Sequence, residues 1–272
     1  MPDSIEYKIS VTSEAIKEML IALLSSEAAN GFEEEKDVLK VFFLVGDCDE
    51  FSIEKIIKQN DLNYFKSIIK EENWNAMWES DFKPVTIGKF CRIRASFHEP
   101  GKNVEHDIII TPKMSFGTGH HPTTQLMIEA MEKLEIKEKS VFDFGTGTGI
   151  LSILADKSGA GNITAIDNDE WSINNAFENF NLNNCHKILL SNNEQIPANS
   201  IFDIILANIN LNIILQNMGK MEQHLHSKGV LLLSGLLAGD EPVIIAEAQR
   251  KNLRLSAKSE MNGWICLRMV KG

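Results

Sequence analysis

The stretch Val141–Ile150, VFDFGTGTGI, places Gly145, Gly147 and Gly149 at alternate positions directly after an apolar run. A buried strand that leads into a glycine-rich turn and then a helix is typical of the first β–α turn of a doubly wound sheet, where a ligand lies closest to the main chain. Glycines there adopt backbone angles that other residues avoid, and they carry no side chain to hold a ligand off. The helix that follows presents unpaired N–H groups, which favour an anionic group.

The spacing of these glycines separates the ligand classes. A dinucleotide fingerprint reads G-x-G-x-x-G, but the sixth position counted from Gly145 is Ile150, and no Gly-Lys-Ser/Thr follows to make a P-loop. The pattern is instead D-x-G-x-G-x-G, beginning at Asp143. The next strand, NITAID, ends at Asp167, 22 residues after Gly145, where a carboxylate meets ribose hydroxyls. An adenosine ligand without a pyrophosphate fingerprint indicates S-adenosylmethionine.

Two plainer interpretations stay open for these residues. A three-glycine turn also occurs simply as a tight turn. Either Asp167 or Asp169 is able to cap the helix that begins after ITAIDND, and Asp169 fits that role better.

The chain from residue 101 onward alternates strands and helices, which predicts the larger of two domains. Its apolar strands are nearly continuous and are separated by helices, which implies a parallel sheet covered on both faces. The last two strands, residues 253–260 and 264–270, are joined by MNG without a helix, so the final strand should run antiparallel to its neighbour. We therefore expect an α/β fold with a doubly wound, mostly parallel seven-stranded sheet.

Residues 1–75 predict a small α+β domain with the ferredoxin-like order β-α-β-β-α-β. Its strands are expected at IEYKISV, FEEE, VLKVFFLV and YFKSIIK, with helices from Ser13 and over SIEKIIKQ. Residues 76–100 are expected to connect the two domains. Near the start of this connector, Trp74 and Trp78 stand four residues apart and predict one face of a helix.

Composition narrows the possible partners. The formal net charge is −11 and no Lys/Arg run stands out, which argues against nucleic-acid binding. No segment approaches the roughly 18 apolar residues of a membrane span, and the start MPDSIEYKIS lacks the features of a signal peptide. We therefore expect a cytoplasmic protein with no membrane partner. The four scattered cysteines predict reduced thiols, and the adjacent His120 and His121 suggest no third ligand, so no metal is expected.

A second motif, SFGTGHHPTTQ, lies upstream of the glycine turn at residues 115–125. Pro122 is suited to the first position of a helix. Thr123 and Thr124 then fall in its first turn, an end that suits the α-carboxylate of a bound amino-acid moiety. Gly117 and Gly119 would let the preceding loop fold over a ligand.

D-x-G-x-G-x-G followed by I-D-x-D resembles the class I methyltransferases. Together with F-G-T-G-x-H-P-T-T upstream and A-N-I after the fourth strand, it is similar to the PrmA family, whose members methylate ribosomal protein L11. The resemblance extends along nearly the whole chain. It implies a cytoplasmic, S-adenosylmethionine-dependent protein N-methyltransferase that acts on lysine side chains and/or the N-terminal amine of L11, free or on the large ribosomal subunit.

The resemblance also implies roles for single residues. It places the cofactor on Thr124, Gly145, Asp167 and Asn208, and the glycine turn adds Gly147. Asn208 would also orient the acceptor amine. Related amino-methyltransferases carry Asn/Asp-Pro-Pro-aromatic at this point, whereas this chain has Asn-Ile-Asn-Leu, so Asn210 is a second candidate. The small N-terminal domain would grip the protein substrate.

Other functions stay open from the sequence alone. One is a class I methyltransferase that acts on a glutamine side chain, a small molecule or RNA. The others are a nicotinamide-dependent oxidoreductase, against which Ile150 speaks, and a cofactor-binding module without catalysis.

Overall fold

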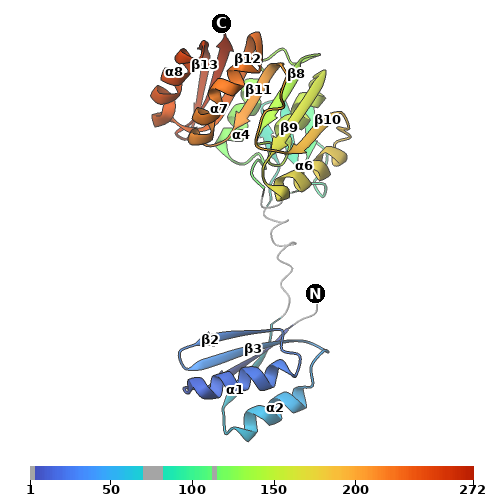
Figure 1. The fold of residues 1–272 in the computed structure, drawn as a ribbon. Coiled ribbons are helices and arrows are strands. Elements are labelled where there is room, and N and C mark those ends of the chain that lie inside the picture. Colours follow the sequence, from blue (N-terminus) through green and yellow to red (C-terminus); the bar gives the residue numbers. More distant parts are fainter. Residues whose placement is uncertain (1–3, 70–81, 112–114) are drawn as a thin grey trace. The chain divides into compact units, whose positions relative to one another are not determined.

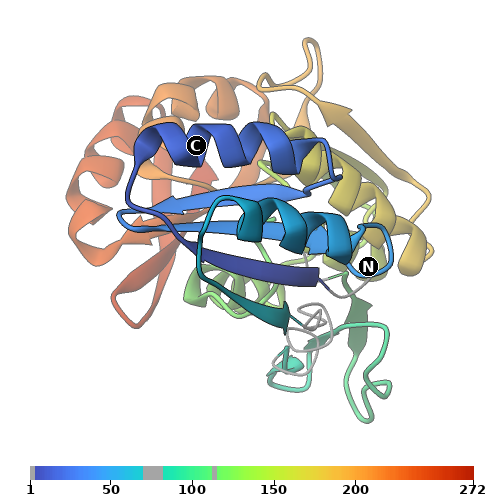
Figure 2. The same cartoon turned by 90° about the horizontal axis from the view of Figure 1, so that it is seen from below.

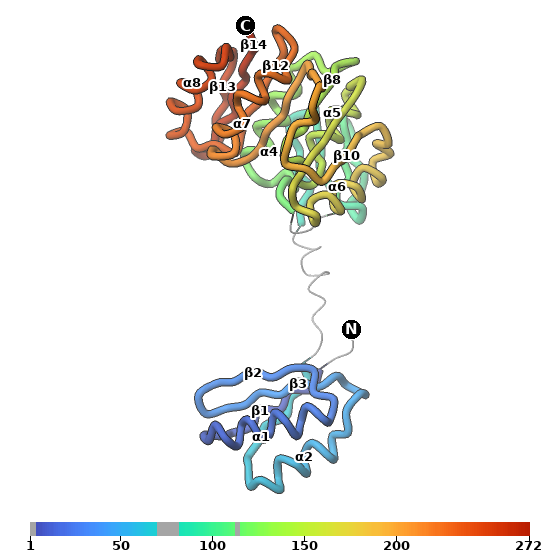
Figure 3. The backbone as a smooth tube through the Cα atoms, in the orientation of Figure 1, coloured from blue at the N-terminus to red at the C-terminus, as the bar shows by residue number. Residues whose placement is uncertain are grey.

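The computed structural model describes residues 4–69, 82–111 and 115–272, and the chain divides into two compact units, Met1–Asp81 and Phe82–Gly272 (Figure 1). Figure 3 traces the backbone of each. Residues 82–100, expected as part of the connector, belong to the second unit. The rest of that connector that precedes residue 82, with the helical face expected from Trp74 and Trp78, lies outside the described residues.

The first unit has the predicted β-α-β-β-α-β order. It contains β1 (Ser4–Ser10), α1 (Glu14–Ser25), β2 (Gly31–Glu35), β3 (Val38–Leu44), α2 (Glu50–Gln59) and β4 (Tyr64–Ile69). The strands form one sheet in the order β2-β3-β1-β4, and every neighbouring pair is antiparallel. This arrangement confirms the ferredoxin-like prediction.

One face of this small sheet carries the core. Tyr7 and Ile9 of β1 are completely buried, and Leu20 of α1 and Ile53 of α2 pack into the same cluster. Side chains alternate across a strand, so the residues between them point to the other face. Both helices therefore cover a single face, as Figure 2 shows from below.

The second unit contains the predicted seven-stranded sheet, in the order β10-β9-β8-β11-β12-β14-β13. Six strands run in one direction, and β14 runs antiparallel to both of its neighbours, β12 and β13, which confirms the prediction for the final hairpin. The strands are β8 (Ser140–Phe144), β9 (Asn162–Asp167), β10 (Ile188–Asn192), β11 (Phe202–Asn208), β12 (Leu225–Leu237), β13 (Leu253–Met261) and β14 (Trp264–Lys271).

Helices cover both faces of this sheet. Residues of α4 (Pro122–Met131), α5 (Ile150–Lys157) and α6 (Glu170–Leu182) share one core cluster with Val141 and Ile163. Residues of α7 (Leu211–Gln223) and α8 (Glu241–Arg250) share the other with Phe142 and Ile166. Residues 193–201 cross from β10 to β11 as a loop without a helix. The doubly wound class is confirmed.

A second, three-stranded sheet lies within residues 82–111. It comprises β5 (Val85–Ile87), β6 (Cys91–Arg94) and β7 (His106–Ile109), with β7 at one edge. Cys91, Ile93 and Ile108 are completely buried in the cluster shared with α4, α5 and α6. This stretch is thus part of the second unit's core.

Two asparagines of α6, Asn175 and Asn179, and the asparagine that caps its C-terminus, Asn183, satisfy the backbone at the edge of β7 and just beyond it; we call these three residues the asparagine column. Asn183 accepts from the N–H of Ile109 at 3.0 Å and donates to its carbonyl at 2.6 Å. Asn179 accepts from the N–H of Thr111 at 2.7 Å, and Asn175 donates to its carbonyl at 3.2 Å. Spaced four residues apart, the three side chains share one helical face and take the place of a neighbouring strand.

Within the part of the chain that the structure describes, no helix is long and apolar enough to cross a membrane.

Candidate active site

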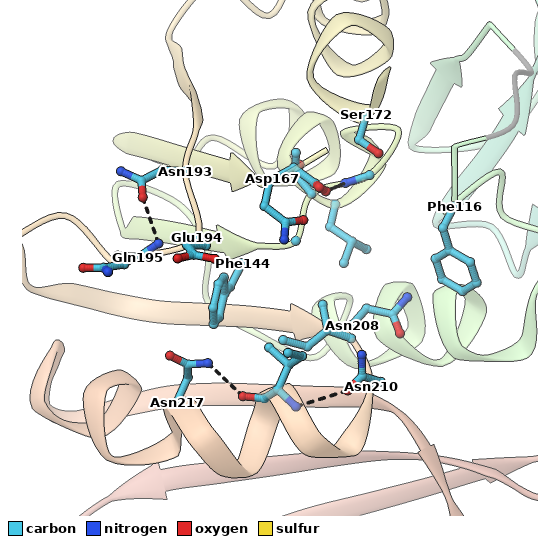
Figure 4. A pocket seen from close by; sticks show the side chains of 18 of the residues that line it. Phe116, Phe144, Asp167, Ser172, Asn193, Glu194, Gln195, Asn208, Asn210 and Asn217 are labelled. Carbon is cyan, nitrogen blue, oxygen red and sulfur yellow. Dashed lines mark hydrogen bonds between the residues drawn. The ribbon is translucent and has the colours of Figure 1, made fainter. Parts of the chain in front are cut away.

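A cavity of about 640 Å³ opens where β8, β9 and β11 end (Figure 4). In a doubly wound sheet this carboxyl edge is where ligands bind. All five residues expected to hold the cofactor line this one cavity, as does the second candidate for the amine, Asn210. The five are Thr124, Gly145, Gly147, Asp167 and Asn208.

The Asp167 carboxylate joins the end of β9 to the glycine turn. Its Oδ2 accepts from the backbone N–H of Gly147 at 2.9 Å, and its Oδ1 accepts from the N–H of Asp169 at 3.1 Å. Each carboxylate oxygen has a second lone pair, so the group is able to accept further hydrogen bonds from a diol in the cavity.

Asp169, and not Asp167, caps α6. The Asp169 side chain accepts from the backbone N–H groups of Trp171 and Ser172, and the Ser172 hydroxyl donates to it at 2.9 Å. The Ser172 hydrogen bond holds the pKa of Asp169 below its ordinary value. The predicted division between the two acids is therefore present: one caps a helix and the other faces the cavity.

Asp143 stabilises the glycine turn through hydrogen bonds. Its side chain is buried, and its Oδ2 accepts from the hydroxyls of Thr146 and Ser152, each at 2.7 Å. Burial raises the pKa of Asp143 to about 6 even though these two hydrogen bonds favour the carboxylate. Asp143 does not line the cavity, so its part is to hold the loop.

The start of α4 forms another wall. Pro122 is the first helical residue, as predicted, and His121 caps the helix. Thr124 is buried, and its hydroxyl lies 3.5 Å from Nδ2 of Asn208. The other side-chain atom of Asn208, Oδ1, is buried and has no hydrogen-bond partner. A buried acceptor without a donor is costly, so this atom points to a ligand that supplies one.

The two adjacent histidines engage different partners. His120 Nε2 lies 3.0 Å from the carbonyl of Lys83, and His121 Nδ1 lies 2.8 Å from the hydroxyl of Thr123. The His121 ring also packs between Phe116 and Trp264, at 5.2 and 4.7 Å between centroids. Among the described residues, no three His, Cys, Asp or Glu side chains form a group that fits a metal ion.

Some residues that line the cavity were not among those predicted from the sequence. Phe116 and the loop at Asn193, Glu194 and Gln195 line it, at opposite sides in Figure 4. Phe116 belongs to the SFGTG motif, which gave it no role, and the residues of the loop at Asn193 follow no periodic pattern that would have identified them. The α7 wall did carry a signal, because its members stand at i, i+3, i+4 and i+7 and so share one helical face. They are Ile213, Gln216, Asn217 and Lys220.

The lining fits a nucleoside without a phosphate chain. Asp167 offers a carboxylate to a ribose, and Asn208 offers an unpartnered amide oxygen at another wall. Among the described residues that line the cavity, only Lys220 carries a cationic side chain, and it lies on α7 and not at the glycine turn. A pyrophosphate at the turn would therefore meet the Asp167 carboxylate, and no described cationic side chain lies there to offset the repulsion.

Comparison with known proteins gives concordant results. The family model described as "Ribosomal protein L11 methyltransferase (PrmA)" matches residues 8–272. The ribosomal protein L11 methyltransferase of Bacteroides thetaiotaomicron is 34% identical over 272 residues, which cover 97% of each chain. The protein of the same name from Chlorobaculum parvum is 38% identical over 254 residues, covering 88% of this chain and 86% of that one.

Among solved structures, the ribosomal protein L11 methylase of Lactobacillus delbrueckii subsp. bulgaricus superimposes with a TM-score of 0.66. It is 29% identical in sequence, and the match covers 70% of this chain and 100% of that chain.

Proposed function

The chain belongs to the PrmA family of ribosomal protein L11 methyltransferases, and we propose that it transfers methyl groups from S-adenosylmethionine to amino groups of L11, on lysine side chains, the N-terminal amine or both. One observation carries the proposal: Asp167, the glycine turn and Asn208 all line a single cavity, and Oδ1 of Asn208 is buried there without a hydrogen-bond partner. A ribose hydroxyl pair and an acceptor N–H are the groups that match them.

Each part of the cofactor has a matching residue. Asp167 would accept hydrogen bonds from the ribose, the turn at Gly145 and Gly147 would lie against the nucleoside, and Thr124 would bind the methionine carboxylate. When bound, S-adenosylmethionine supplies an electrophilic methyl group on a sulfonium. The protein's contribution to such a displacement is to bring the two reactants together in line and to exclude water.

Asn208 is proposed to orient the acceptor. A lysine amine is an ammonium below its pKa of about 10.4 and must lose a proton before it has a lone pair. An amide oxygen accepts an N–H and carries no negative charge, so Oδ1 of Asn208 would direct the lone pair while stabilising the ammonium less than a carboxylate would. His121 is a poor base, because its Nδ1 already accepts from the Thr123 N–H at 3.4 Å. We assign proton removal to water.

The first unit is proposed to grip L11. It has a core of its own, and its exposed apolar side chains include Phe65 of β4, which is 65% exposed. Phe65 pairs with Lys8, on the sheet face opposite to α1 and α2. We propose that this exposed ring contacts the protein substrate. The formal net charge of −11 favours recognition of the L11 protein over recognition of RNA. We propose that L11 is recognised either free or on the large ribosomal subunit. We place the reaction in the cytoplasm.

The test is incubation of the full chain with methyl-labelled S-adenosylmethionine and either purified L11 or a ribosomal extract. We expect label in L11, and mass spectrometry then locates it on lysine Nζ or the α-amine. A chain of residues 82–272 serves as the control. It should bind S-adenosylmethionine in calorimetry but leave L11 unlabelled. Label on RNA or on a glutamine side chain would refute the acceptor, and full activity of the shortened chain would refute the role of the first unit.

A further inference from the structure

Thr148 lies between two glycines of the turn and is completely buried. Its backbone N–H donates to the carbonyl of Phe116 at 3.0 Å, and its hydroxyl donates to the carbonyl of Gly117 at 2.8 Å. Its own carbonyl accepts from Nδ2 of Asn179 at 2.8 Å. Every polar group of this residue is therefore used, and two of the three bonds hold the segment that carries Phe116.

The glycine turn packs closely against the segment Phe116–Gly117. A Cβ on Gly147 would overlap with the carbonyl oxygen of Phe116, and a Cβ on Gly117 would lie 2.9 Å from the hydroxyl oxygen of Thr148. Real Cβ atoms do not approach so closely, and both glycines have positive φ, +55° and +103°. The two glycines are thus needed for the close approach of the segments, apart from any contact with a ligand.

Further contacts tie Thr111 to the glycine turn and Phe116 to the start of α4. Asn179 accepts from the N–H of Thr111 and donates to the carbonyl of Thr148. One side chain therefore links Thr111, just after β7, to the glycine turn. After the segment, His121 caps α4, and its ring contacts Phe116. The backbone of Phe116 is therefore held firmly while its ring remains 52% exposed in the cavity wall.

Figure 4 shows Phe116 on the same side of the cavity as Asn208, and Asn193, Glu194 and Gln195 on the other. Asp167 lies between them. The ring is thus an apolar surface in the wall of the cavity that Asn208 also lines, and it lies across from the loop at Asn193. The methylene stem of a lysine side chain buries well against such a surface while its nitrogen reaches a polar atom.

We infer that Thr148 is a positioning residue of the methyl-transfer site: it acts through Phe116, whose ring it fixes as the wall that aligns the acceptor side chain with Asn208. This rests on the function proposed above. Thr148 does not line the cavity and touches no reactant, so its effect on the reaction passes through the Phe116–Gly117 backbone.

The first experiment compares Thr148→Val with Thr148→Ser. Valine keeps the shape and the backbone N–H but removes the hydroxyl, whereas serine retains the hydroxyl. Loss of one hydrogen bond of ordinary strength corresponds to about a three- to tenfold change. We expect Thr148→Val to lower kcat/KM for L11 by that factor, with S-adenosylmethionine affinity unchanged in calorimetry, and Thr148→Ser to restore turnover. An equal loss of cofactor affinity, or turnover by Thr148→Val equal to that of the starting protein, would overturn the inference.

The second experiment is a double-mutant cycle with Phe116→Ala. If Thr148 acts through Phe116, Thr148→Val costs nothing further once the ring is gone, because interacting residues are not additive. Independent, additive losses contradict the inference. Should Thr148→Val fail to fold, Phe116→Ala alone decides. If the Phe116→Ala protein methylated L11 as fast as the starting protein, the ring would have no role in aligning the acceptor, and the inference would be wrong. Failure of the proposed function is distinct, because the unchanged protein would then leave L11 unmethylated.

Discussion

The backbone N–H of Gly147 and the carboxylate of Asp167 are joined by a hydrogen bond of 2.9 Å, so one side chain both braces the glycine turn and faces the cavity. The two roles are compatible because a carboxylate oxygen accepts more than one hydrogen bond. A substitution at Asp167 therefore acts on ligand contacts and on the shape of the turn together.

We expect Asp167→Ala to weaken S-adenosylmethionine binding by at least about tenfold, since hydrogen bonds to a charged group are stronger than neutral ones. Isothermal titration calorimetry measures the change, and circular dichroism checks the fold. Asp169→Ala is the matched control: Asp169 caps α6 and does not line the cavity, so its loss should lower the melting temperature and leave affinity intact. Unchanged affinity in a folded Asp167→Ala protein would remove Asp167 from the ribose.

Asn208→Ala should lower kcat for L11 methylation by about tenfold or more while reducing cofactor affinity less, because the amide oxygen is assigned to the acceptor in the transition state. Steady-state kinetics with calorimetry separate the two effects. Asn212→Ala, an exposed position on α7, is the control. Asn210 caps α7 by accepting from the N–H of Ile213 at 3.1 Å. If Asn210→Ala reduced kcat more than Asn208→Ala, the acceptor role would belong to Asn210.

Asp143 should make stability depend on pH. Burial raises its pKa in the folded protein to about 6 from an ordinary value of 3.8. Between these two values the folded state binds more protons than the unfolded state, so this contribution to stability is full below about pH 4 and is lost as pH rises through 6. Two pKa units correspond to about 3 kcal/mol. Urea unfolding from pH 4.5 to 7 should show Asp143→Asn gaining stability relative to the starting protein as pH rises. Parallel curves would contradict the shift.

Asn179→Ala should destabilise the second unit by about 2–6 kcal/mol, because it leaves the N–H of Thr111 and the carbonyl of Thr148 without their partner, and each such unpaired group costs about 1–3 kcal/mol. Urea unfolding gives the free energy. Asn181→Ala on the exposed side of the same helix is the control and should change stability little. Equal stabilities for the two variants would show that the asparagine column is dispensable.

Local patterns explain what could be predicted. The final hairpin followed from MNG between two strands, the start of α4 from Pro122, and the cap of α6 from Asp169. Each signal lies within a few residues of the feature that it sets. Four of the five residues proposed to bind the cofactor lie at or just after the ends of parallel strands, which meet at one edge of the sheet, so their proximity was also predictable; the fifth, Thr124, lies in the first turn of α4.

Features that depend on distant partners were not predictable. The strands β5 and β6 contain only three and four residues, too few for a periodic pattern, and they lie within the expected connector. The spacing of Asn175, Asn179 and Asn183 is visible in the sequence. Their partners, Ile109 and Thr111, stand more than 60 residues away, and nothing local identifies them. The link from Thr148 to Phe116 depends on the same kind of long-range approach.

The asparagine column has a consequence for the protein in concentrated solution. An open sheet edge offers free N–H and C=O groups that recruit strands from other molecules and lead to aggregation. Here the main-chain groups of Ile109 and Thr111 are already taken by side chains of the protein's own helix. The asparagine side chains thus prevent the edge of a short strand from pairing with strands of other protein molecules. Other proteins obtain the same protection from lysines or prolines on the edge strand itself.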